Sequence, residues 1–329
     1  MASLREKKTK ELDEKLRAVN KQKDLFSFAG YDEAAAERTG YSNYSYWRST
    51  FQTFFKNKVA VFLLIIMATI LIFTFIQPYL PGQIDPNLVN NDETGMQIRN
   101  QKPDSTFWFG TNQIGQDLWS RTWAGTRTSL LIGFLVAVIE AAVGITVGVL
   151  WGYVRKLDFI LTEVYNVLDN IPTTIVLILF SYIMKPSIHS MVIAMSITGW
   201  IGMARFIRNQ IVIIRDRDYN LASRCLGTGT ARIMIKNLLP YLVSVIMLRM
   251  ALAIPGAIGS EVFISYIGLG LPVDIPSLGN LINTGRAKMM TASLRYQLVF
   301  PTIILSIVTI SFYIIGNAFA DAADPKNHV

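Results

Sequence analysis

The chain has 329 residues, of which 51% are hydrophobic and 16% charged, and its formal net charge is +8. The charged fraction is well below the roughly 25% typical of soluble domains, so the composition predicts that lipid surrounds much of the chain. Nucleic-acid binding would need a basic face on a folded domain, whereas these charges are dispersed between apolar segments. The single cysteine, Cys225, excludes an intramolecular disulfide and a paired thiol redox motif.

The first part of the chain, residues 1–58, is polar and of mixed charge. It contains no apolar core ahead of a small-residue cleavage site, so it does not predict a cleaved signal peptide, and the first apolar stretch is expected to be a retained anchor. Near its end, aromatic residues recur at helical spacing beside basic side chains: Trp47, Phe51, Phe54 and Phe55. This pattern predicts an interfacial elbow helix, and aromatic residues that simply flank a membrane span are the alternative.

Six apolar stretches are each long enough to cross a bilayer, whose core of about 30 Å needs about 20 residues of helix. They are residues 59–76, 129–153, 159–184, 187–207, 241–270 and 297–320. The sequence therefore predicts an all-α membrane protein with six transmembrane helices. Its expected parts are an N-terminal segment over 1–58, a first transmembrane helix over 59–80, a loop over 81–127, a core of five helices over 128–320 and a tail over 321–329.

The distribution of Lys and Arg predicts the orientation of these spans. Basic residues are concentrated before the first span and between the fourth and fifth spans, and such an excess marks cytoplasmic loops. Six spans place both termini on one side, so we expect the N- and C-termini to be cytoplasmic and the loop over 81–127 to be extracytoplasmic. Arg286, Lys288 and Arg295 are exceptions, because they fall on the outer side.

The second span carries a carboxylate, Glu140, close to a stripe of small residues. A carboxylate in mid-membrane costs about 2.5–3.5 kcal/mol on insertion scales, so Glu140 should face protein or a water-filled cavity. Lining of a pore and a structural hydrogen bond are both open. The stripe itself predicts close helix packing, and its members are Gly133, Ala137, Ala141, Gly144, Gly148 and Gly152.

The third and fifth spans also contain polar residues. Asp169 belongs to a polar cluster ahead of Pro172, which we interpret as a partly wetted helix entry. In the fifth span, Arg249 and Glu261 lie about 18 Å apart along a helix, too far to pair within one straight span. Both are candidates for a pore or for packing, as are Glu140 and Asp169. Pro255 and Gly256 predict a hinge, because proline removes a backbone donor.

The connection between the fourth and fifth spans, which we expect over 205–239, is basic. Its first part can form two helical turns that end at a glycine, the residue that best tolerates a left-handed cap. These residues are Asp218, Tyr219, Asn220, Leu221, Ala222, Ser223, Arg224, Cys225, Leu226 and Gly227. A second helical run over 232–239 is expected to stop at Pro240. The pattern predicts a short helix across the membrane base, bent at Gly227, and a loop lying on the headgroups is the alternative.

This connection resembles the coupling loop of the permease subunits of binding-protein-dependent ABC importers. Ala222 and Ser223 match the two small residues of the EAA-type motif, Gly227 matches its glycine, and Leu239 with Pro240 matches a later Leu-Pro pair. Leu221 stands where the motif has a glutamate, a departure that occurs in the peptide branch of the family.

Further matches are similar to the C-type permease subunit of oligopeptide and dipeptide importers. Residues 109–117, followed by Ser120-Arg121 and Gly125, resemble the family's FGTD-x-x-G-R-D segment, with Asn112 and Gln116 as substitutions. The runs over 261–270, 276–279 and 321–325 also fit, so the resemblance covers roughly 109–325. Asn166 occupies a place where the family often has an acid.

The resemblance implies a type I ABC importer permease fold in a bacterial cytoplasmic membrane, with a coupling helix over 220–226 that docks on an ATP-binding subunit. The implied partners are a second homologous permease, two ABC ATPases and an extracytoplasmic peptide-binding protein. The chain has no G-x-x-x-x-G-K-S/T phosphate loop, so ATP and magnesium are expected on the ATPases, with no cofactor here and no enzyme activity. The expected cargo is a dipeptide or oligopeptide, with a nickel complex as the alternative.

A secondary transporter and a membrane-embedded enzyme are the two other classes of function for a chain with these spans. A gradient-driven secondary transporter would use Glu140, Asp169 and Glu261 as proton or ion sites and would show inverted repeats, none of which is clear. A membrane-embedded enzyme would need a nucleophile or metal set near His189 or His328, and the sequence offers neither.

Overall fold

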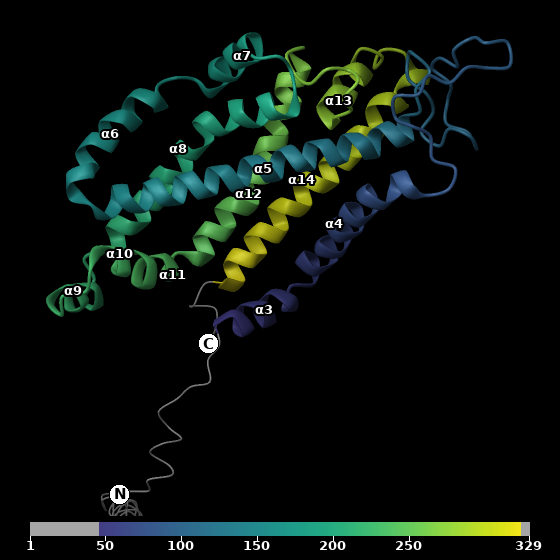
Figure 1. The fold of residues 1–329 in the computed structure, drawn as a ribbon. Helices are drawn as coiled ribbons and strands as arrows, with labels where there is room; N and C mark the ends of the chain where they lie inside the picture. Colours follow the sequence, from purple (N-terminus) through teal and green to yellow (C-terminus); the bar gives the residue numbers. More distant parts are fainter. Residues whose placement is uncertain (1–45, 324–329) are drawn as a thin grey trace, which may run out of the picture. The chain divides into compact units, whose positions relative to one another are not determined.

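A computed structural model provides the structure of the protein and describes residues 46–323. The expectations for residues 1–45, and for the end of the tail with Asp324 and Pro325, lie outside the described residues. Residues 46–323 form helices and loops with no β-strand, and only isolated bridges occur, in the loop over residues 89–117 (Figure 1). The predicted all-α class is confirmed.

The helices occupy most of the described chain. The first half contains α3 (Tyr46–Lys56), α4 (Lys58–Ile76), η1 (Gln77–Tyr79), α5 (Leu118–Tyr153), α6 (Arg155–Asp169), α7 (Thr173–Ile183) and α8 (Ile188–Ile214). The second half contains α9 (Asp218–Cys225), α10 (Thr230–Ile233), the π-helical turn η2 (Met234–Leu238), α11 (Leu239–Tyr241), α12 (Val243–Tyr266), α13 (Leu278–Arg286), η3 (Ala292–Leu294) and α14 (Tyr296–Ala323).

Five of these helices are long and apolar enough to cross a membrane: α4, α5, α8, α12 and α14. The predicted third span over 159–184 is not one straight helix, because α6 and α7 meet at an angle of 74°. The cause is Pro172, which cannot donate within a helix and which disfavours helical geometry at Ile171 before it. The six predicted spans are therefore five continuous helices and one bent pair.

Two predicted boundaries are wrong, both because a helix continues further than hydropathy shows. The second span begins at Leu118, not near 129, since the Asp117 side chain accepts hydrogen bonds from Trp119 N and Ser120 N and starts α5 there. The fourth span continues to Ile214, so the connection predicted over 205–239 begins inside a helix. Ile211 and Ile214 are buried and extend the apolar face of α8.

The later part of the predicted small-residue stripe, Gly144, Gly148 and Gly152, lies at the contact between α5 and α8, whereas Gly133 lies against Ile254 and Ile258 of α12. A Cβ atom added at Gly148 would lie 2.6 Å from Ala204 O and 2.7 Å from Ile207 Cβ, and one at Gly152 would lie 2.7 Å from Ile211 Cβ. Such distances require glycine at these positions. This part of the stripe therefore sets the spacing of α5 and α8.

Gly148→Val is expected to destabilise the folded chain by about 1–3 kcal/mol, the usual cost of overpacking a tight helix contact. The measurement is the midpoint of unfolding in a detergent titration. Gly202→Ala on α8 is the matched control, because nothing lies within 4 Å of a Cβ atom added there. Equal stability of the two variants would contradict close packing at Gly148.

The first and last described helices are in contact at one end of the bundle. Phe54 of α3 is buried with Ala60 of α4 and with Ala318 and Ala322 of α14. The Phe54 and Phe319 rings lie 6.0 Å apart, while Trp47, Phe51 and Phe55 remain exposed. The aromatic residues expected on an elbow helix thus lie on α3, whose place at a membrane interface stays a prediction.

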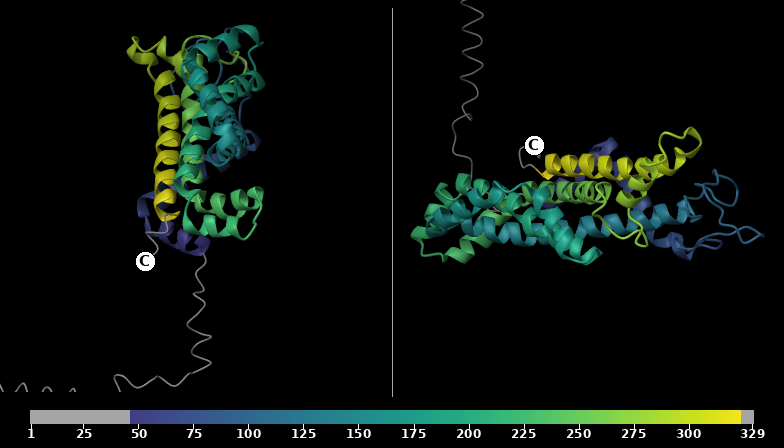
Figure 2. Two further views of the ribbon diagram at one scale, coloured as in Figure 1. Left: turned by 90° about the vertical axis from the view of Figure 1, so that its left-hand side faces the viewer. Right: turned by 90° about the horizontal axis from the view of Figure 1, so that it is seen from above.

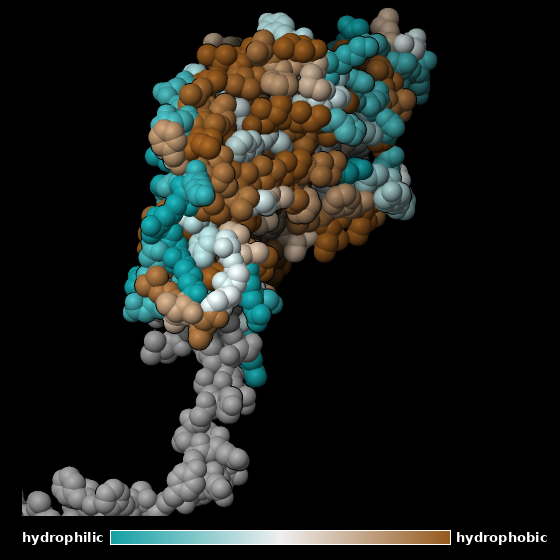
Figure 3. Space-filling view, turned by 60° about the vertical axis from the view of Figure 1, so that its left-hand side comes forward, coloured by the Kyte–Doolittle hydropathy of each residue, from teal (hydrophilic) through white to brown (hydrophobic). Residues whose placement is uncertain are grey.

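The outer surface carries an apolar band. Figure 3 shows hydrophobic residues over the middle of the face in view and hydrophilic residues towards both ends. Large exposed apolar side chains lie on α4, α6 and α7, among them Phe62, Phe159 and Ile183. An apolar belt between polar ends is the surface expected of a protein that lies in a bilayer.

Candidate functional site

The connection between α8 and α12 contains the candidate site, and α9 is its first element. The helix ends in a double cap, in which Gly227 N donates to Arg224 O at 2.9 Å and Thr228 N donates to Ser223 O at 3.0 Å. Gly227 has a φ of +78°, a left-handed conformation that disfavours any side chain. The sequence correctly predicts both the two helical turns and the glycine at which they end.

The second helical run does not stop at Pro240 as predicted. It runs through α10, η2 and α11 to Tyr241, and Pro240 lies inside it. The π-helical turn directly before α11 is wider than an α-helical turn, and we attribute the tolerance of the proline ring to this turn. The connection therefore leads from the end of α8 to the start of α12 with short helices throughout (Figure 1).

A buried asparagine fixes α9 to its neighbours. Asn220 is completely buried, and its Nδ2 donates to Ile214 O at the end of α8 at 2.9 Å. Asn237, in the π-helical turn, donates to Asn220 Oδ1 and to Ser223 Oγ, both at 3.2 Å. α8, α9 and the run that leads to α12 are thus joined at one point.

Asn220→Ala should loosen α9, because it leaves Ile214 O and the Asn237 amide without these partners at a cost of about 1–3 kcal/mol. The expected result is hydrogen exchange at the α9 amides that is faster by about five- to 150-fold. Asn209→Ala on α8 is the control, since Asn209 is exposed. Unchanged exchange in α9 would show that Asn220 does not anchor the helix.

Charged side chains link α9 to the corner between α5 and α6. Asp216 lies 3.5 Å from Arg224 of α9, 3.3 Å from Arg215 and 3.7 Å from Arg155 at the start of α6. Arg215 Nη1 also donates to Gly152 O of α5 at 2.6 Å. Exposed ion pairs of this kind add little stability, so their effect is to orient α9 against the end of α5.

Exposed apolar side chains on α9 and at its C-cap form a group that we call the α9 face: Tyr219, Leu221 and Leu226. Leu226 is 86% exposed, and Leu221 is the residue that replaces the glutamate of the EAA-type motif. α9 to α11 lie at the end of the bundle away from the loop that precedes α5, as the views in Figures 1 and 2 agree. Apolar side chains that extend from a polar end of a molecule indicate a contact surface.

An apolar cluster packs the connection against the ends of α5, α8 and α12. Ile211 and Ile214 of α8 pack with Ile233, Leu238 and Leu242 of the connection. The same cluster includes Val149 of α5 and Ile246 of α12. Displacement of the connection would therefore be transmitted to three membrane-spanning helices.

Glu261 lies at the centre of a second polar group, far from α9 in the sequence. It is 0% exposed and accepts hydrogen bonds from Ser277 Oγ at 2.7 Å, Ser265 Oγ at 2.9 Å and Ser129 Oγ at 3.0 Å. Ser129 Oγ in turn accepts from Leu278 N. Glu261 therefore joins α5, α12 and the start of α13, and its contacts are those of a packing residue.

The other candidate residues are not brought together with Glu261. Asp169 is half-exposed and lies 3.8 Å from Arg205 of α8. Glu140 lies against Gly199 of α8, and the Arg249 guanidinium lies over the Phe206 ring. Pro255 is buried in α12, which runs without a break through Pro255 and Gly256, so the predicted hinge is not visible as an interruption of the helix.

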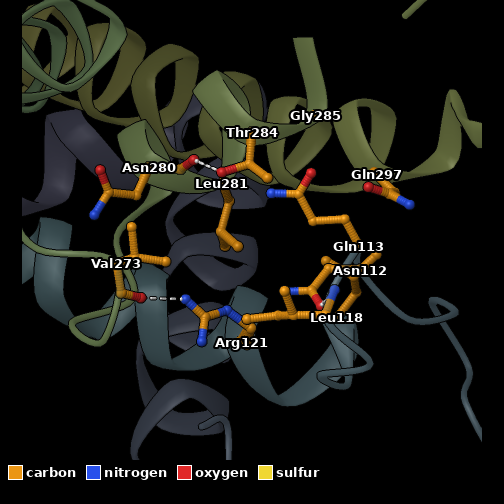
Figure 4. A pocket seen from close by; sticks show the side chains of 11 residues that line it. Asn112, Gln113, Leu118, Arg121, Val273, Asn280, Leu281, Thr284, Gly285 and Gln297 are labelled. Atoms are coloured by element: carbon orange, nitrogen blue, oxygen red, sulfur yellow. Dashed lines mark hydrogen bonds between the residues drawn. The ribbon is translucent and has the colours of Figure 1, made fainter. Parts of the chain in front are cut away.

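The loop before α5 contacts the segment between α12 and α14 and the start of α14, through residues to which the sequence analysis assigned no role. Arg121 is 2% exposed, and its guanidinium donates to Pro86 O at 3.0 Å and to Val273 O at 2.7 Å. Tyr296 OH donates to Gln101 O at 2.8 Å. A cavity of about 80 Å³ lies beside Arg121 (Figure 4). In the sequence, the match of Ser120-Arg121 to the family motif was the one indication that Arg121 has a specific role.

Turns in the loop before α5 are held by two aspartates. The hydrogen bond from the Thr94 hydroxyl lowers the pKa of Asp92. The backbone N–H of Phe107 lowers the pKa of Asp104, to which Gln101 also donates. Within residues 46–323, no group of three or more His, Cys, Asp or Glu side chains is placed to hold a metal ion.

Comparison with protein families gives two matches along the chain. Residues 144–329 match the model described as the binding-protein-dependent transport system inner membrane component. Residues 45–103 match the model of the N-terminal TM domain of oligopeptide transport permease C. Together these matches include most of the described helices.

Curated proteins and solved structures add further similarities. The oligopeptide transport system permease protein AmiD of Streptococcus pneumoniae is 40% identical over 93% of this chain and 98% of that protein. The dipeptide transport system permease protein DppC of Bacillus subtilis is 34% identical over 86% of each chain. Among solved structures, an inward-facing form of the MetNI methionine ABC transporter is 20% identical, covers 61% of this chain and 96% of that chain, and gives a TM-score of 0.49.

Proposed function

Because this chain belongs to the family of binding-protein-dependent transport system inner membrane components, in the branch of the peptide permeases, we propose that it forms half of the pore of an ATP-driven importer. The proposed cargo is a dipeptide or an oligopeptide. The relatives named above are oligopeptide and dipeptide permeases, and this supports the choice. The chain is an integral inner-membrane permease subunit and not itself an enzyme.

The observation that carries this proposal is the rigidly anchored α9 with its exposed apolar face. In the proposed complex, the α9 face (Tyr219, Leu221 and Leu226) docks in a groove of an ATPase subunit. Closure of the ATPases around nucleotide would then move α9 together with α8 and α12, because Asn220 and the apolar cluster beneath join these elements. Such a movement would switch the pore between inward and outward access.

The proposed complex contains a second, homologous permease, two ATPases and an extracytoplasmic peptide-binding protein. ATP and magnesium belong to the ATPases, in keeping with the lack of a phosphate-loop motif in this sequence. We orient the chain with α9, α3 and both termini on the cytoplasmic side. The arginines around α9 support this orientation, because basic residues are retained in the cytoplasm.

The contacts of two of the three acidic candidates, Glu261 and Asp169, do not favour a gradient-driven transporter. Glu261 is surrounded by three serine hydroxyls, and Asp169 lies beside Arg205. An ion site would need such carboxylates to bind and release an ion or a proton from a water-filled pathway.

The test is reconstitution of the chain in proteoliposomes with a second permease, the two ATPases and a binding protein. We expect uptake of a radiolabelled tripeptide that requires ATP and survives collapse of ion gradients by ionophores. Uptake by the chain alone would contradict the proposal. Uptake of a nickel complex without peptide uptake would support an ATP-driven importer and refute peptides as its cargo.

A further inference from the structure

Glu140 of α5 and Arg249 of α12 are charged side chains of the membrane-spanning helices that have no hydrogen bond or ion pair within residues 46–323. Lys58, the first residue of α4, and Arg127, in the N-terminal part of α5, share this property, and both lie away from the middle of their helices. Glu261 and Arg208, in contrast, have partners: serine hydroxyls and Asp158. Because an ionisable group in the membrane is costly, an unpaired one indicates a binding partner outside the chain or a water-filled pathway.

Glu140 occupies a notch in the surface of α8. A Cβ atom added at Gly199 would overlap the Glu140 carboxylate, so glycine at this position makes room for it. The side chain is half-buried, and Gly199 lies near the middle of α8. The carboxylate is therefore held in mid-membrane at the edge of the contact between α5 and α8.

Arg249 lies against the same side of α8, closer to its C-terminal end. The Arg249 guanidinium carbon lies 4.3 Å from the centroid of the Phe206 ring. Gly199 and Phe206 are two helical turns apart on one face, which places the two contacts about 10 Å apart along α8. Gly202 lies between them, is exposed, and has open space where a Cβ atom would be.

We propose that Glu140 and Arg249 bind the two termini of a short zwitterionic peptide as it crosses the membrane. Glu140 would accept from the peptide α-ammonium group, and Arg249, placed over the Phe206 ring, would donate to the α-carboxylate. An extended chain spans about 3.3–3.6 Å per residue, so about three residues match the spacing of about 10 Å between Gly199 and Phe206, the points at which the two side chains contact α8. This inference rests on the proposed function and adds to it a substrate site within the permease.

The experiment uses the complete complex in proteoliposomes and compares Ala-Ala-Ala with its N-acetyl and C-amide forms. Peptide concentrations saturate the binding protein, so that its own preference affects all permease variants equally. Glu140→Gln should reduce the preference for a free amino terminus by about tenfold and leave the preference for a free carboxylate unchanged. Arg249→Gln should reduce the preference for a free carboxylate by about tenfold and leave the preference for a free amino terminus unchanged. Glu163→Gln, an exposed acid on α6, is the control.

The outcomes separate this inference from the proposed function. Absence of ATP-dependent peptide uptake by the wild type would refute the proposed function. Normal uptake with unchanged terminal preferences in both Gln variants would overturn the substrate site alone. Failure of either Gln variant to assemble with its partners would also overturn it, because the charge would then serve packing against the second permease. Loss of one preference in each variant would support it.

Discussion

Gly227→Pro is expected to abolish ATP-driven uptake while the chain still inserts into the membrane. Proline fixes φ at about −65°, whereas Gly227 has a φ of +78°, and the substitution also removes the N–H that donates to Arg224 O. The bend between α9 and α10 cannot survive this change, so the α9 face would no longer point towards an ATPase. Uptake and peptide-stimulated ATP hydrolysis in proteoliposomes are the measurements.

The chain offers a matched control two residues later. Gly229 has a φ of −65°, which suits proline, and no hydrogen bond from its N–H is present among the described residues. Nothing lies within 4 Å of a Cβ atom added there. Gly229→Pro should therefore keep uptake within about twofold of the wild type. If the two proline variants transported equally well, α9 would not be the coupling element.

Glu261→Ala is expected to be the most destabilising single change, at about 3 kcal/mol or more. It removes a buried acceptor from three serine hydroxyls at once and leaves a cavity where α5, α12 and α13 meet. The effect would appear as a lower midpoint of unfolding in a detergent titration. Less of the chain should also be recovered in the assembled complex.

Two further variants test why Glu261→Ala loses stability. Glu261→Gln retains one acceptor oxygen and the volume of the side chain, so it should recover part of the stability. Glu163→Ala removes an exposed carboxylate from α6 and should leave the midpoint unchanged. A midpoint for Glu261→Ala equal to that of Glu163→Ala would show that the serine network adds no stability.

The apolar helices could be predicted from the sequence because hydropathy is a local property. The extension of α5 back to Leu118 could not, since its first turn carries Arg121, a charged residue that is buried against Pro86 and Val273 of two loops distant in sequence. The continuation of α8 past 207 was missed for a similar reason. Arg208 interrupts the apolar pattern and is paired with Asp158, a residue of α6 that is distant in sequence.

The candidate site was predictable to the extent that its geometry is local. The cap at Gly227 follows from short-range backbone geometry, and the spacing of the small residues could be compared with a family motif. The role of Asn220 depends on Asn237 across the connection, and that of Glu261 depends on Ser129 from another helix. No periodicity in one sequence indicates which distant partner such a side chain meets.

The contact between α3 and α14 imposes an order on biogenesis. Phe54 of α3 is buried by Ala318 and Ala322 near the end of α14, a helix synthesised more than 200 residues after α3. Throughout synthesis of the intervening helices, the ring of Phe54 has no such cover and must remain at the lipid surface or be shielded by another factor. A chain that stopped translation before α14 would therefore expose this ring, and quality-control proteases could distinguish it from the finished permease.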